Sequence, residues 1–340
     1  MKGVVYCGPG EVRVRDLPMP VVRDPRDVVV RVTRTAICGT DLHPYRGELP
    51  GFPAGTVLGH EFAGVVQETG AGSPFAVGDR VFASDVIACG RCRHCERGRH
   101  YQCASVSLFG YADVVGAPVD GGQAEYVRVP FADVVLAAIP VGVSDEQAVF
   151  VGDVLTTAYG AVRDAGVTAG DTVAVVGGGP VGLLGALCAR QAGASRIVVA
   201  DREPVRRERA RSMGFEAVPP AQLSTTVRGG ADRVIEAVGT DAALLTALEV
   251  TGPAACVAVA GAHHSTAMPF PTGLAFAREL TIRFSVGNPI RLRAEVLALV
   301  AAGELDPVDV VSHRFALDDA AHAYREFDQR IAFKVMMHAS

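Results

Sequence analysis

Two polar stretches near the start of the chain carry side chains that could bind a metal ion. The run "AICGTDLHPYRG" contains Cys38, and "LGHEFAG" contains His60 and Glu61. A lone Cys or His usually fills a core, but a thiol and an imidazole in two turn-flanked polar stretches are typical of zinc ligands. A catalytic zinc takes three protein ligands and keeps a fourth position open. The sequence therefore predicts a catalytic zinc site on Cys38 and His60.

A third ligand is expected from "FVGDVLTTAYGA", the stretch at the predicted domain junction. Asp153 is the only side chain in this stretch that suits zinc. Thiolate, carboxylate and neutral imidazole would together balance the two charges of the ion.

A separate cluster places four of the eight cysteines in "CGRCRHCERGRHYQC". Its members are Cys89, Cys92, Cys95 and Cys103. Four thiolates at short spacings, in a chain without a secretory mark, are typical of one tetrahedral zinc with no open position. An iron–sulfur cluster is the competing interpretation, but its usual spacings do not match this run. We expect a structural zinc here, with His94 and His100 at the surface, because four thiolates already complete the coordination sphere.

The composition is that of a globular protein from a reducing compartment. Hydrophobic residues make up 49% of the 340 residues, and the 37 acidic residues outnumber the 32 basic ones. A nucleic-acid surface would need a basic excess. No apolar run approaches the ~18 residues of a membrane span, and the N-terminus lacks the apolar core of a signal peptide. We therefore expect a cytoplasmic protein of two domains that binds neither nucleic acid nor membrane.

A glycine loop lies in "TVAVVGGGPVGLLGALCARQAGA", which predicts a strand, a turn and a helix. Its G-x-G-x-x-G pattern consists of Gly177, Gly179 and Gly182, with Pro180 and Val181 between the last two. The first glycine permits a tight turn, the second admits a pyrophosphate, and the third lets the helix pack close to the strand. The helix N-terminus favours phosphate groups. This context predicts a dinucleotide-binding site.

Asp201 ends the next predicted strand, nineteen residues after Gly182. Its carboxylate can accept hydrogen bonds from both hydroxyls of the adenine ribose and would repel a 2′-phosphate, which favours NAD over NADP. An arginine group just beyond it comprises Arg202, Arg206 and Arg207. These arginines could pair with a 2′-phosphate, but we expect them to form an exposed helix face paired with Glu203 and Glu208.

The elements that must position these groups follow two patterns. Up to about residue 150, short strands with tight turns are expected at 28–33, 61–70, 78–83 and 123–130. From 172 onward, strands at 172–179, 196–203, 231–239 and 255–261 alternate with helices at 180–194, 204–214, 242–251 and 290–305. This alternation predicts an α/β fold with a parallel sheet covered on both faces.

The Cys-Gly-Thr-Asp-x-His run, the Gly-His-Glu triplet, the four-cysteine lobe and the late G-x-G-x-x-G occur in this order. Together they resemble the zinc-dependent medium-chain alcohol dehydrogenases, and within them the branch of sorbitol, threonine and secondary-alcohol dehydrogenases. The resemblance covers essentially the whole chain. It implies a GroES-like, β-rich catalytic domain of residues 1–150, completed by about 305–340. It also implies a Rossmann domain of residues 151–304, a doubly wound parallel sheet, with the active site in the cleft.

The resemblance implies a catalytic zinc on Cys38, His60 and Asp153, with Glu61 beside the metal and able to approach it. Many relatives place Cys or Glu where Asp153 stands. The third ligand therefore stays open between Asp153 and Glu61.

Three further residues receive roles from the resemblance. Thr40 would pass the alcohol proton on, His43 would deliver it to solvent through the cofactor ribose, and Thr157 would lie near the nicotinamide. The implied reaction is hydride transfer between NAD(H) and an alcohol–carbonyl pair at a zinc-bound oxygen. The implied cofactors are two zinc ions per chain and NAD(H). The implied assembly is a homodimer or homotetramer through strands near 280–286.

Other functions stay open at this point. The chain could be a non-catalytic zinc and dinucleotide sensor or scaffold, or an NADPH-dependent carbonyl reductase of the same family. A zinc-free reductase would lack Cys38, His60 and the cysteine lobe. The substrate class stays open among secondary alcohols, polyols, amino alcohols and sugars. Four aromatic residues could line a substrate pocket or fill the core: Tyr45, Phe52, Phe62 and Phe109.

Overall fold

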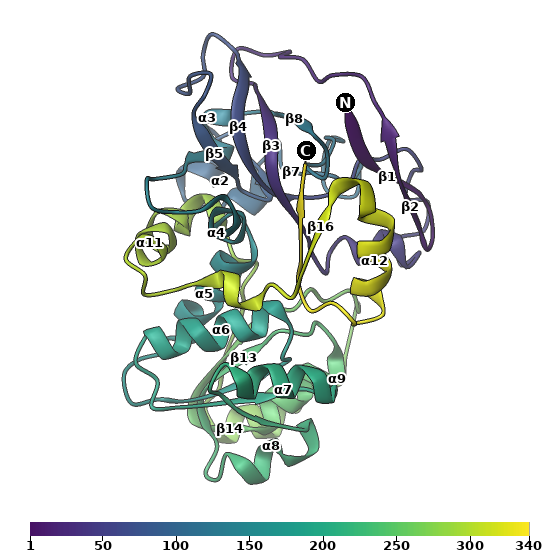
Figure 1. Cartoon of the computed structure of the whole chain (residues 1–340). Coiled ribbons are helices and arrows are strands. Elements are labelled where there is room, and N and C mark those ends of the chain that lie inside the picture. Colours follow the sequence, from purple (N-terminus) through teal and green to yellow (C-terminus); the bar gives the residue numbers. More distant parts are fainter. Residues whose placement is uncertain (340) are drawn as a thin grey trace. The chain divides into compact units, whose positions relative to one another are not determined.

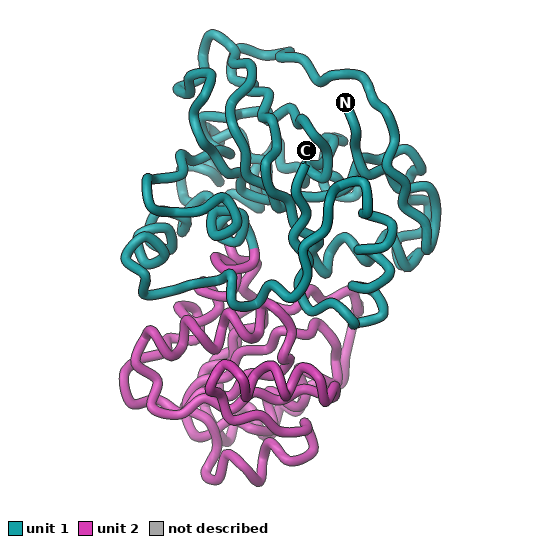
Figure 2. The backbone as a smooth tube through the Cα atoms, viewed as in Figure 1, with its two compact units in different colours: residues 1–153, 288–340 teal, residues 154–287 magenta. Residues whose placement is uncertain are grey.

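The structure is a computed structural model that describes residues 1–339. The chain forms two compact units, which Figure 2 shows in different colours. Unit 1 contains residues 1–153 and 288–340, and unit 2 contains residues 154–287. No helix within residues 1–339 is long and apolar enough to cross a lipid bilayer.

Unit 1 is built on a seven-stranded sheet (Figure 1). Its strands, in spatial order, are β16 (His313–Ala316), β17 (Val335–His338), β3 (Val28–Ile37), β4 (Glu61–Thr69), β5 (Arg80–Ala83) and β9 (Leu136–Ala138), with β8 (Tyr126–Val129) also paired to β3. The C-terminal strand β17 runs antiparallel to β3, with Val335 opposite Ile37. Residues 335–338 therefore add a strand to the same sheet as residues 28–37.

Smaller elements complete unit 1. The strands are β1 (Lys2–Gly8), β2 (Glu11–Asp16), β6 (Val86–Ile87) and β7 (Ser107–Leu108). The helices are α1 (Leu42–Tyr45), α2 (Arg93–Glu96), α3 (Ala132–Val135), α4 (Asp145–Val151), α11 (Pro289–Ala301) and α12 (Ala320–Asp328), with single turns η1 (His100–Gln102), η2 (Pro307–Val310) and η3 (Leu317–Asp319).

Unit 2 is a six-stranded parallel sheet with helices between successive strands (Figure 1). Its strands, in spatial order, are β12 (Glu216–Val218), β11 (Arg196–Ala200), β10 (Thr172–Val176), β13 (Ala231–Glu236), β14 (Thr251–Val259) and β15 (Thr281–Phe284). The helices are α5 (Val154–Ala165), α6 (Pro180–Gln191), α7 (Pro204–Ser212), α8 (Pro220–Thr226), α9 (Asp241–Glu249) and α10 (Thr272–Ala277). Residues 173–176 of β10 are all buried, as expected for a strand covered on both faces. The strand order reverses between β10 and β13, which defines a doubly wound sheet.

Helix α11 belongs to unit 1, whereas the sequence analysis places residues 290–304 in the coenzyme-binding domain. Asn288 starts this helix, and its side chain accepts a hydrogen bond from the backbone N–H of Arg291. The same side chain donates to Gly98 O at 2.6 Å, and the helix packs against α4. Helical periodicity predicts the helix itself but not the surface against which it packs.

Candidate active site

Three side chains from separate elements of unit 1 meet at one point. Cys38 follows β3, His60 precedes β4, and Asp153 lies just beyond α4. Asp153 Oδ2 lies 3.7 Å from Cys38 Sγ and 3.4 Å from His60 Nε2. A tetrahedral zinc with ordinary bond lengths would separate sulfur from oxygen by about 3.6 Å and nitrogen from oxygen by about 3.4 Å. The spacing of these donor atoms therefore fits a zinc ion.

Glu61 joins the same group, and one donor atom from each of the four residues lies within 4.8 Å of the others. Its carboxylate is fully buried and forms an ion pair with Lys334, whose Nζ lies 2.6 Å from Oε2. The lysine occupies both carboxylate oxygens of Glu61. Asp153 is therefore the better third ligand, and Glu61 is held beside the group by a cation.

Asp41 supports both the cysteine and the histidine from behind. Its Oδ2 accepts hydrogen bonds from the Cys38 backbone N–H at 2.9 Å and from Gln123 Nε2 at 3.2 Å. Its Oδ1 faces His60 Nδ1 at 3.4 Å, and neither of these two buried atoms has another partner. A carboxylate behind a histidine is the usual device that orients a metal-binding imidazole. Sequence reasoning missed Asp41, although it lies inside the motif that contains Cys38.

The metal-free group holds protons that a metal ion would displace. Burial, followed by the charges of Glu61 and Asp153, raises the pKa of Cys38 to about 11. Burial lowers the pKa of His60, but the charges of Asp41 and Cys38 outweigh it and hold that pKa well above its usual value. Zinc binds thiolate and neutral imidazole, so loading must release these protons.

One of the two residues expected to move protons lies next to Cys38. Thr40 Oγ1 is 3.8 Å from Cys38 Sγ. His43 lies on α1, half-buried, and its Nδ1 contacts Glu48 Oε2 at 2.6 Å. Sequence reasoning did not identify Glu48, which fixes the orientation and tautomer of the His43 ring.

The four cysteines of the lobe converge in unit 1, with one sulfur from each within 4.8 Å of the others. Cys92 Sγ lies 3.6 Å from Cys95 Sγ and 3.9 Å from Cys103 Sγ. A tetrahedral zinc–thiolate site would separate its sulfurs by about 3.8 Å. The backbone N–H groups of Cys89 and Ser105 each donate to Cys103 Sγ at 3.3 Å and favour its thiolate, although burial outweighs them and raises the pKa of Cys103. The lobe fits a closed zinc site.

Two side chains connect the lobe to the rest of unit 1. His100 is buried, contrary to the expected surface position, because its Nδ1 contacts Asn288 Oδ1 at 2.8 Å. His94 is exposed, as expected. Tyr101 donates a hydrogen bond to Asp85 Oδ2 at 2.5 Å. The lobe therefore contacts Asp85, whose backbone N–H donates to the residue before Asp153.

The glycine loop of unit 2 begins α6. Gly177 has φ +105°, a conformation that side chains disfavour, and a Cβ at Gly182 would lie 1.8 Å from Gly177 O. The loop and the first turn of α6 therefore approach each other closely. The first N–H groups of a helix have no partner within the helix, and such groups favour phosphates. Pro180 and Val181 form the first helical positions.

Asp201 follows β11 and holds this loop in place. Its Oδ2 accepts from the Gly178 N–H and its Oδ1 from the Glu203 N–H, each at 2.8 Å. Arg206 Nη1 lies 3.4 Å from Asp201 Oδ2. Arg207 donates to the backbone oxygens of Asp201 and Arg202. Arg206 and Arg207 therefore contact oxygen atoms at the end of β11, which lie within reach of the first two turns of α7.

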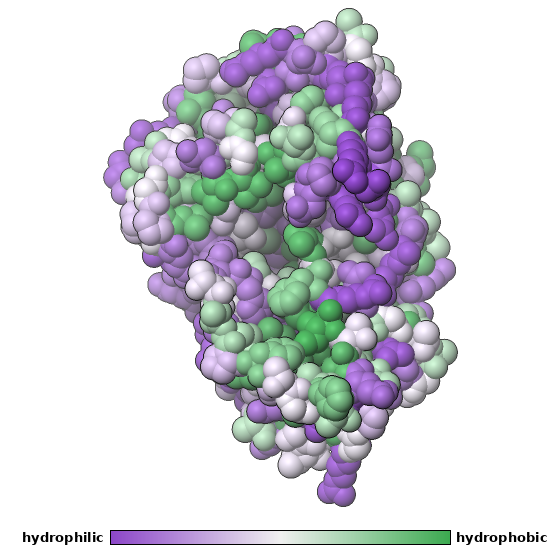
Figure 3. Space-filling view, turned by 180° about the vertical axis from the view of Figure 1, so that it is seen from behind, coloured by the Kyte–Doolittle hydropathy of each residue, from purple (hydrophilic) through white to green (hydrophobic). Residues whose placement is uncertain are grey.

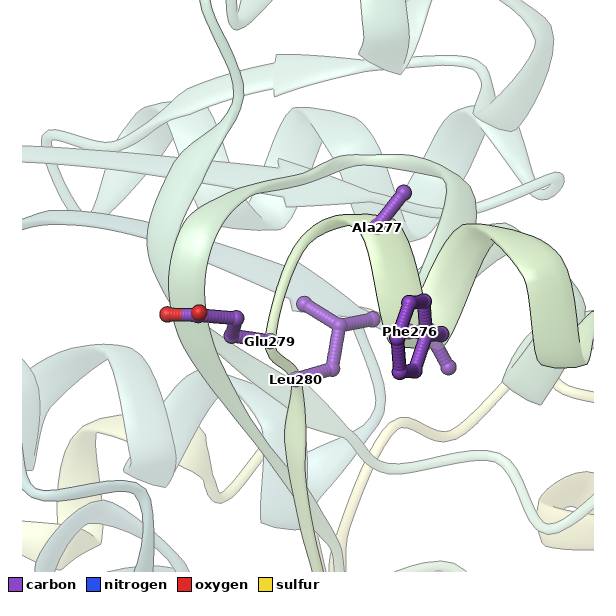
Figure 4. A pocket seen from close by; sticks show the side chains of 5 residues that line it. Phe276, Ala277, Glu279 and Leu280 are labelled. Carbon is purple, nitrogen blue, oxygen red and sulfur yellow. The ribbon is translucent and has the colours of Figure 1, made fainter.

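The aromatic residues and Thr157 are the remaining positions that the sequence singled out. Four aromatic residues are buried in the hydrophobic clusters of unit 1, which favours the core interpretation: Tyr45, Phe52, Phe62 and Phe109. Thr157 lies on α5 of unit 2 beside Gly287. An open hollow, shown in Figure 4, lies on α10 of unit 2 between Phe276 and Leu280 and contains no metal-ligand group.

Comparisons with known proteins identify the class that this fold and site define. Residues 24–140 match the family described as "Alcohol dehydrogenase GroES-like domain", and residues 180–302 match "Zinc-binding dehydrogenase". A probable zinc-binding alcohol dehydrogenase of Mycobacterium tuberculosis is 38% identical over 95% of this chain and 84% of its own length. The chain therefore belongs to the zinc-type alcohol dehydrogenase family of oxidoreductases.

Solved structures agree with this assignment. Alcohol dehydrogenase TADH from Thermus sp. ATN1 matches with a TM-score of 0.96 and 39% identity over 100% of both chains. A zinc-binding dehydrogenase from Sinorhizobium meliloti 1021, bound to NADP, matches with a TM-score of 0.85 and 30% identity over 99% of this chain and 98% of its own. An alcohol dehydrogenase from Escherichia coli CFT073, complexed with NADH, matches with a TM-score of 0.88 and 29% identity over 99% of both.

Proposed function

We propose that this chain is an NAD-dependent alcohol dehydrogenase with one catalytic and one structural zinc ion. The observation that carries the proposal is the position of Asp153 Oδ2, which lies at zinc-ligand separations from both Cys38 Sγ and His60 Nε2 in a member of the zinc-type family. When bound, the zinc would supply a Lewis acid for the substrate oxygen, and the nicotinamide would accept or donate hydride. The substrate is a small alcohol or carbonyl compound.

The chain's own residues would move the proton. Thr40 Oγ1 would accept the proton of the substrate hydroxyl, because it lies beside Cys38. His43 would receive the proton at Nε2, since its Nδ1 is engaged by Glu48. Glu48 would thereby orient the His43 ring for its part as a general base. Asp41 would keep His60 in its ligating orientation.

The preference for NAD rests on Asp201. Its carboxylate lies 7% exposed at the edge of the glycine loop and would clash with a 2′-phosphate. A carboxylate has more acceptor sites than the two backbone N–H groups use, so it can still accept from ribose hydroxyls. Arg206 could instead favour the 2′-phosphate of NADP, but its guanidinium forms an ion pair with Asp201. The Arg202 side chain is exposed beside it.

We also propose a homodimer or homotetramer formed through the edge of the unit 2 sheet. Strand β15 is the last strand of that sheet, and Phe284 and Val286 are 67% and 61% exposed. Phe276 on α10 is 89% exposed. In Figure 3, apolar residues form patches on both the upper and the lower part of the surface shown. An exposed strand edge with apolar neighbours is a natural pairing surface. A mass near 35.4 kDa by light scattering would show a monomer instead.

The direct test is NAD reduction by the zinc-loaded protein with a panel of primary alcohols, secondary alcohols, polyols and amino alcohols. Turnover of at least one class supports the proposal. A protein that binds zinc and NAD but reduces NAD with none of them, and oxidises NADH with none of the matching carbonyls, would be the sensor or scaffold instead. Thr40→Ala serves as the control, because it should keep the metal and lose most of kcat.

A further inference from the structure

A second carboxyl group lies buried beside the candidate metal site. Asp85 lies between β5 and β6, and its backbone N–H donates to Gly152 O at 3.1 Å, one residue before Asp153. Its side chain accepts the Tyr101 hydroxyl on Oδ2. Burial, followed by the charge of Asp153, raises the pKa of Asp85 to about 8. Neither Asp85 nor Tyr101 has a part in the proton path or in the donor set.

The other oxygen of this carboxyl group, Oδ1, has no hydrogen-bond partner, although Asp85 is only 6% exposed. The half-buried guanidinium of Arg293 bonds to the preceding residue instead, because it donates to Ser84 Oγ and to Val135 O. Within residues 1–339, the other buried side-chain atoms of unit 1 without a partner are Asp41 Oδ1 and His60 Nδ1, which face each other. Asp85 Oδ1 is therefore the orphaned acceptor that the site itself does not use.

A buried acceptor without a hydrogen-bond donor destabilises the fold, so such an atom is usually bonded to a water molecule or a ligand. The position next to Asp153 makes a ligand the better occupant, since a substrate bound at the candidate metal site would lie close to it. Asp85 is an acceptor in either protonation state, because a protonated carboxyl group retains acceptor capacity. A substrate group that donates a hydrogen bond is therefore the complement.

We propose that Asp85 Oδ1 accepts a hydrogen bond from a second hydroxyl group of the substrate, so that diols and polyols are preferred to monofunctional alcohols. The proposal rests on the proposed function, because it assumes that the substrate oxygen binds at the group of Cys38, His60 and Asp153. Tyr101 is the positioning residue, since its hydroxyl holds Oδ2 and leaves Oδ1 directed elsewhere. A site built to bond a hydroxyl group disfavours the analogue that lacks it, because the acceptor then stays unpaired.

Binding can be measured without turnover on protein loaded with Co²⁺ in place of Zn²⁺. Propane-1,2-diol and propan-2-ol share a carbon skeleton, and each would be titrated while the visible absorption of the cobalt is recorded. We expect the wild-type protein to bind the diol about tenfold more tightly, the effect of one hydrogen bond to a carboxyl group. In Asp85→Leu this ratio should fall to about one. Ser84→Ala, the matched neighbour, should keep the wild-type ratio.

Asp85→Asn covers the case in which the leucine variant does not fold, because it keeps the shape of the side chain and weakens the acceptor. Its ratio should fall below the wild-type value. Equal wild-type affinity for the two alcohols, or an undiminished ratio in Asp85→Leu or Asp85→Asn, overturns the proposal. Tighter binding of 1-aminopropan-2-ol than of the diol would also overturn it, since the preferred donor would then be an ammonium group. A protein that binds the diol in this way but never reduces NAD would contradict the proposed function and not this inference.

Discussion

Lys334 Nζ lies 2.6 Å from Glu61 Oε2 and 2.8 Å from Oε1, and the two side chains are 1% and 0% exposed. The ammonium also donates to Ile37 O at 3.0 Å. Lys334 directly precedes the C-terminal strand β17, and Glu61 follows the candidate ligand His60. Burial lowers the pKa of Lys334, but Glu61 more than offsets this and raises it above the usual value. The pair therefore ties the end of the chain to the candidate metal site.

Removal of this lysine should strongly destabilise unit 1. Lys334→Met would remove the cation that bonds both oxygens of the buried Glu61 carboxylate, which costs up to about 3–5 kcal/mol in the free energy of unfolding. Urea unfolding of the metal-loaded protein measures this cost. The double variant Glu61→Gln/Lys334→Met should recover much of it, because the unpaired charge is gone.

The only other lysine provides the matched control. Lys2 forms an exposed pair with Asp318, so Lys2→Met should change the unfolding midpoint very little. An equal effect of Lys2→Met and Lys334→Met would contradict the importance of the buried pair.

Loss of a lobe cysteine should remove one of two zinc ions. Cys103 is buried in the lobe and accepts two backbone hydrogen bonds, so Cys103→Ser should disrupt the site and lower stability. Elemental analysis of loaded protein should fall from two zinc ions per chain to one, while calorimetry should show normal NAD binding. A wild-type content of one zinc, or iron in the lobe, would show that the assignment is mistaken.

Exchange of the acidic residue at the glycine loop should change the coenzyme preference. Asp201→Ser removes the like charge that opposes a 2′-phosphate and releases Arg206 from its 3.4 Å ion pair. We expect the ratio of kcat/KM for NADP to that for NAD to rise by one or more orders of magnitude, because a close like-charge contact costs several kcal/mol. Arg206→Ser in the same background should reverse part of the gain. A wild-type enzyme that already prefers NADP would count against the role of Asp201.

The ion pairs of Glu146 should contribute stability that disappears in acid. Hydrogen bonds from Arg314 lower the pKa of Glu146 despite partial burial, with help from Arg34. A carboxyl group with a lowered pKa stabilises the fold above its unfolded pKa, and this contribution is lost as the pH falls through the folded pKa.

Glu146→Gln should therefore reduce stability at pH 7 by at most about 1 kcal/mol, because the group is partly exposed to solvent. Below about pH 4 the variant and the wild-type protein should converge. Unfolding midpoints measured from pH 3 to pH 7 check this convergence. A constant difference across that range would show that the carboxylate charge does not matter.

The parts of the site that the sequence predicted are those encoded by local spacing. Cys38 lies in a short motif, the lobe cysteines are separated by two to seven residues, and the glycine loop lies between one strand and one helix. Residues this close in sequence are brought together by the local chain, so their spacing alone predicts that they form a site. The alternation of strands and helices predicts the parallel sheet, whereas its doubly wound order is what the family resemblance implies.

The supporting residues were not predictable in the same way. Lys334 reaches Glu61 across 273 positions, and Asn288 reaches Gly98 across 190. Asp85 and Tyr101 are near in sequence, but their pairing depends on the fold of the whole lobe. Contacts made by tertiary packing leave no periodic pattern in one sequence. The same reason explains why α11 was placed in the wrong unit.

The most direct test of the account is the turnover number for NAD reduction after loss of one candidate zinc ligand. His60→Ala should retain its fold and its NAD affinity, since the glycine loop lies in unit 2, yet lose measurable kcat together with one zinc ion. Cys7→Ser, which alters a cysteine outside both donor sets, should keep the wild-type kcat and both zinc ions. A His60→Ala protein that lacks this zinc and still oxidises alcohol with wild-type kcat would contradict the account.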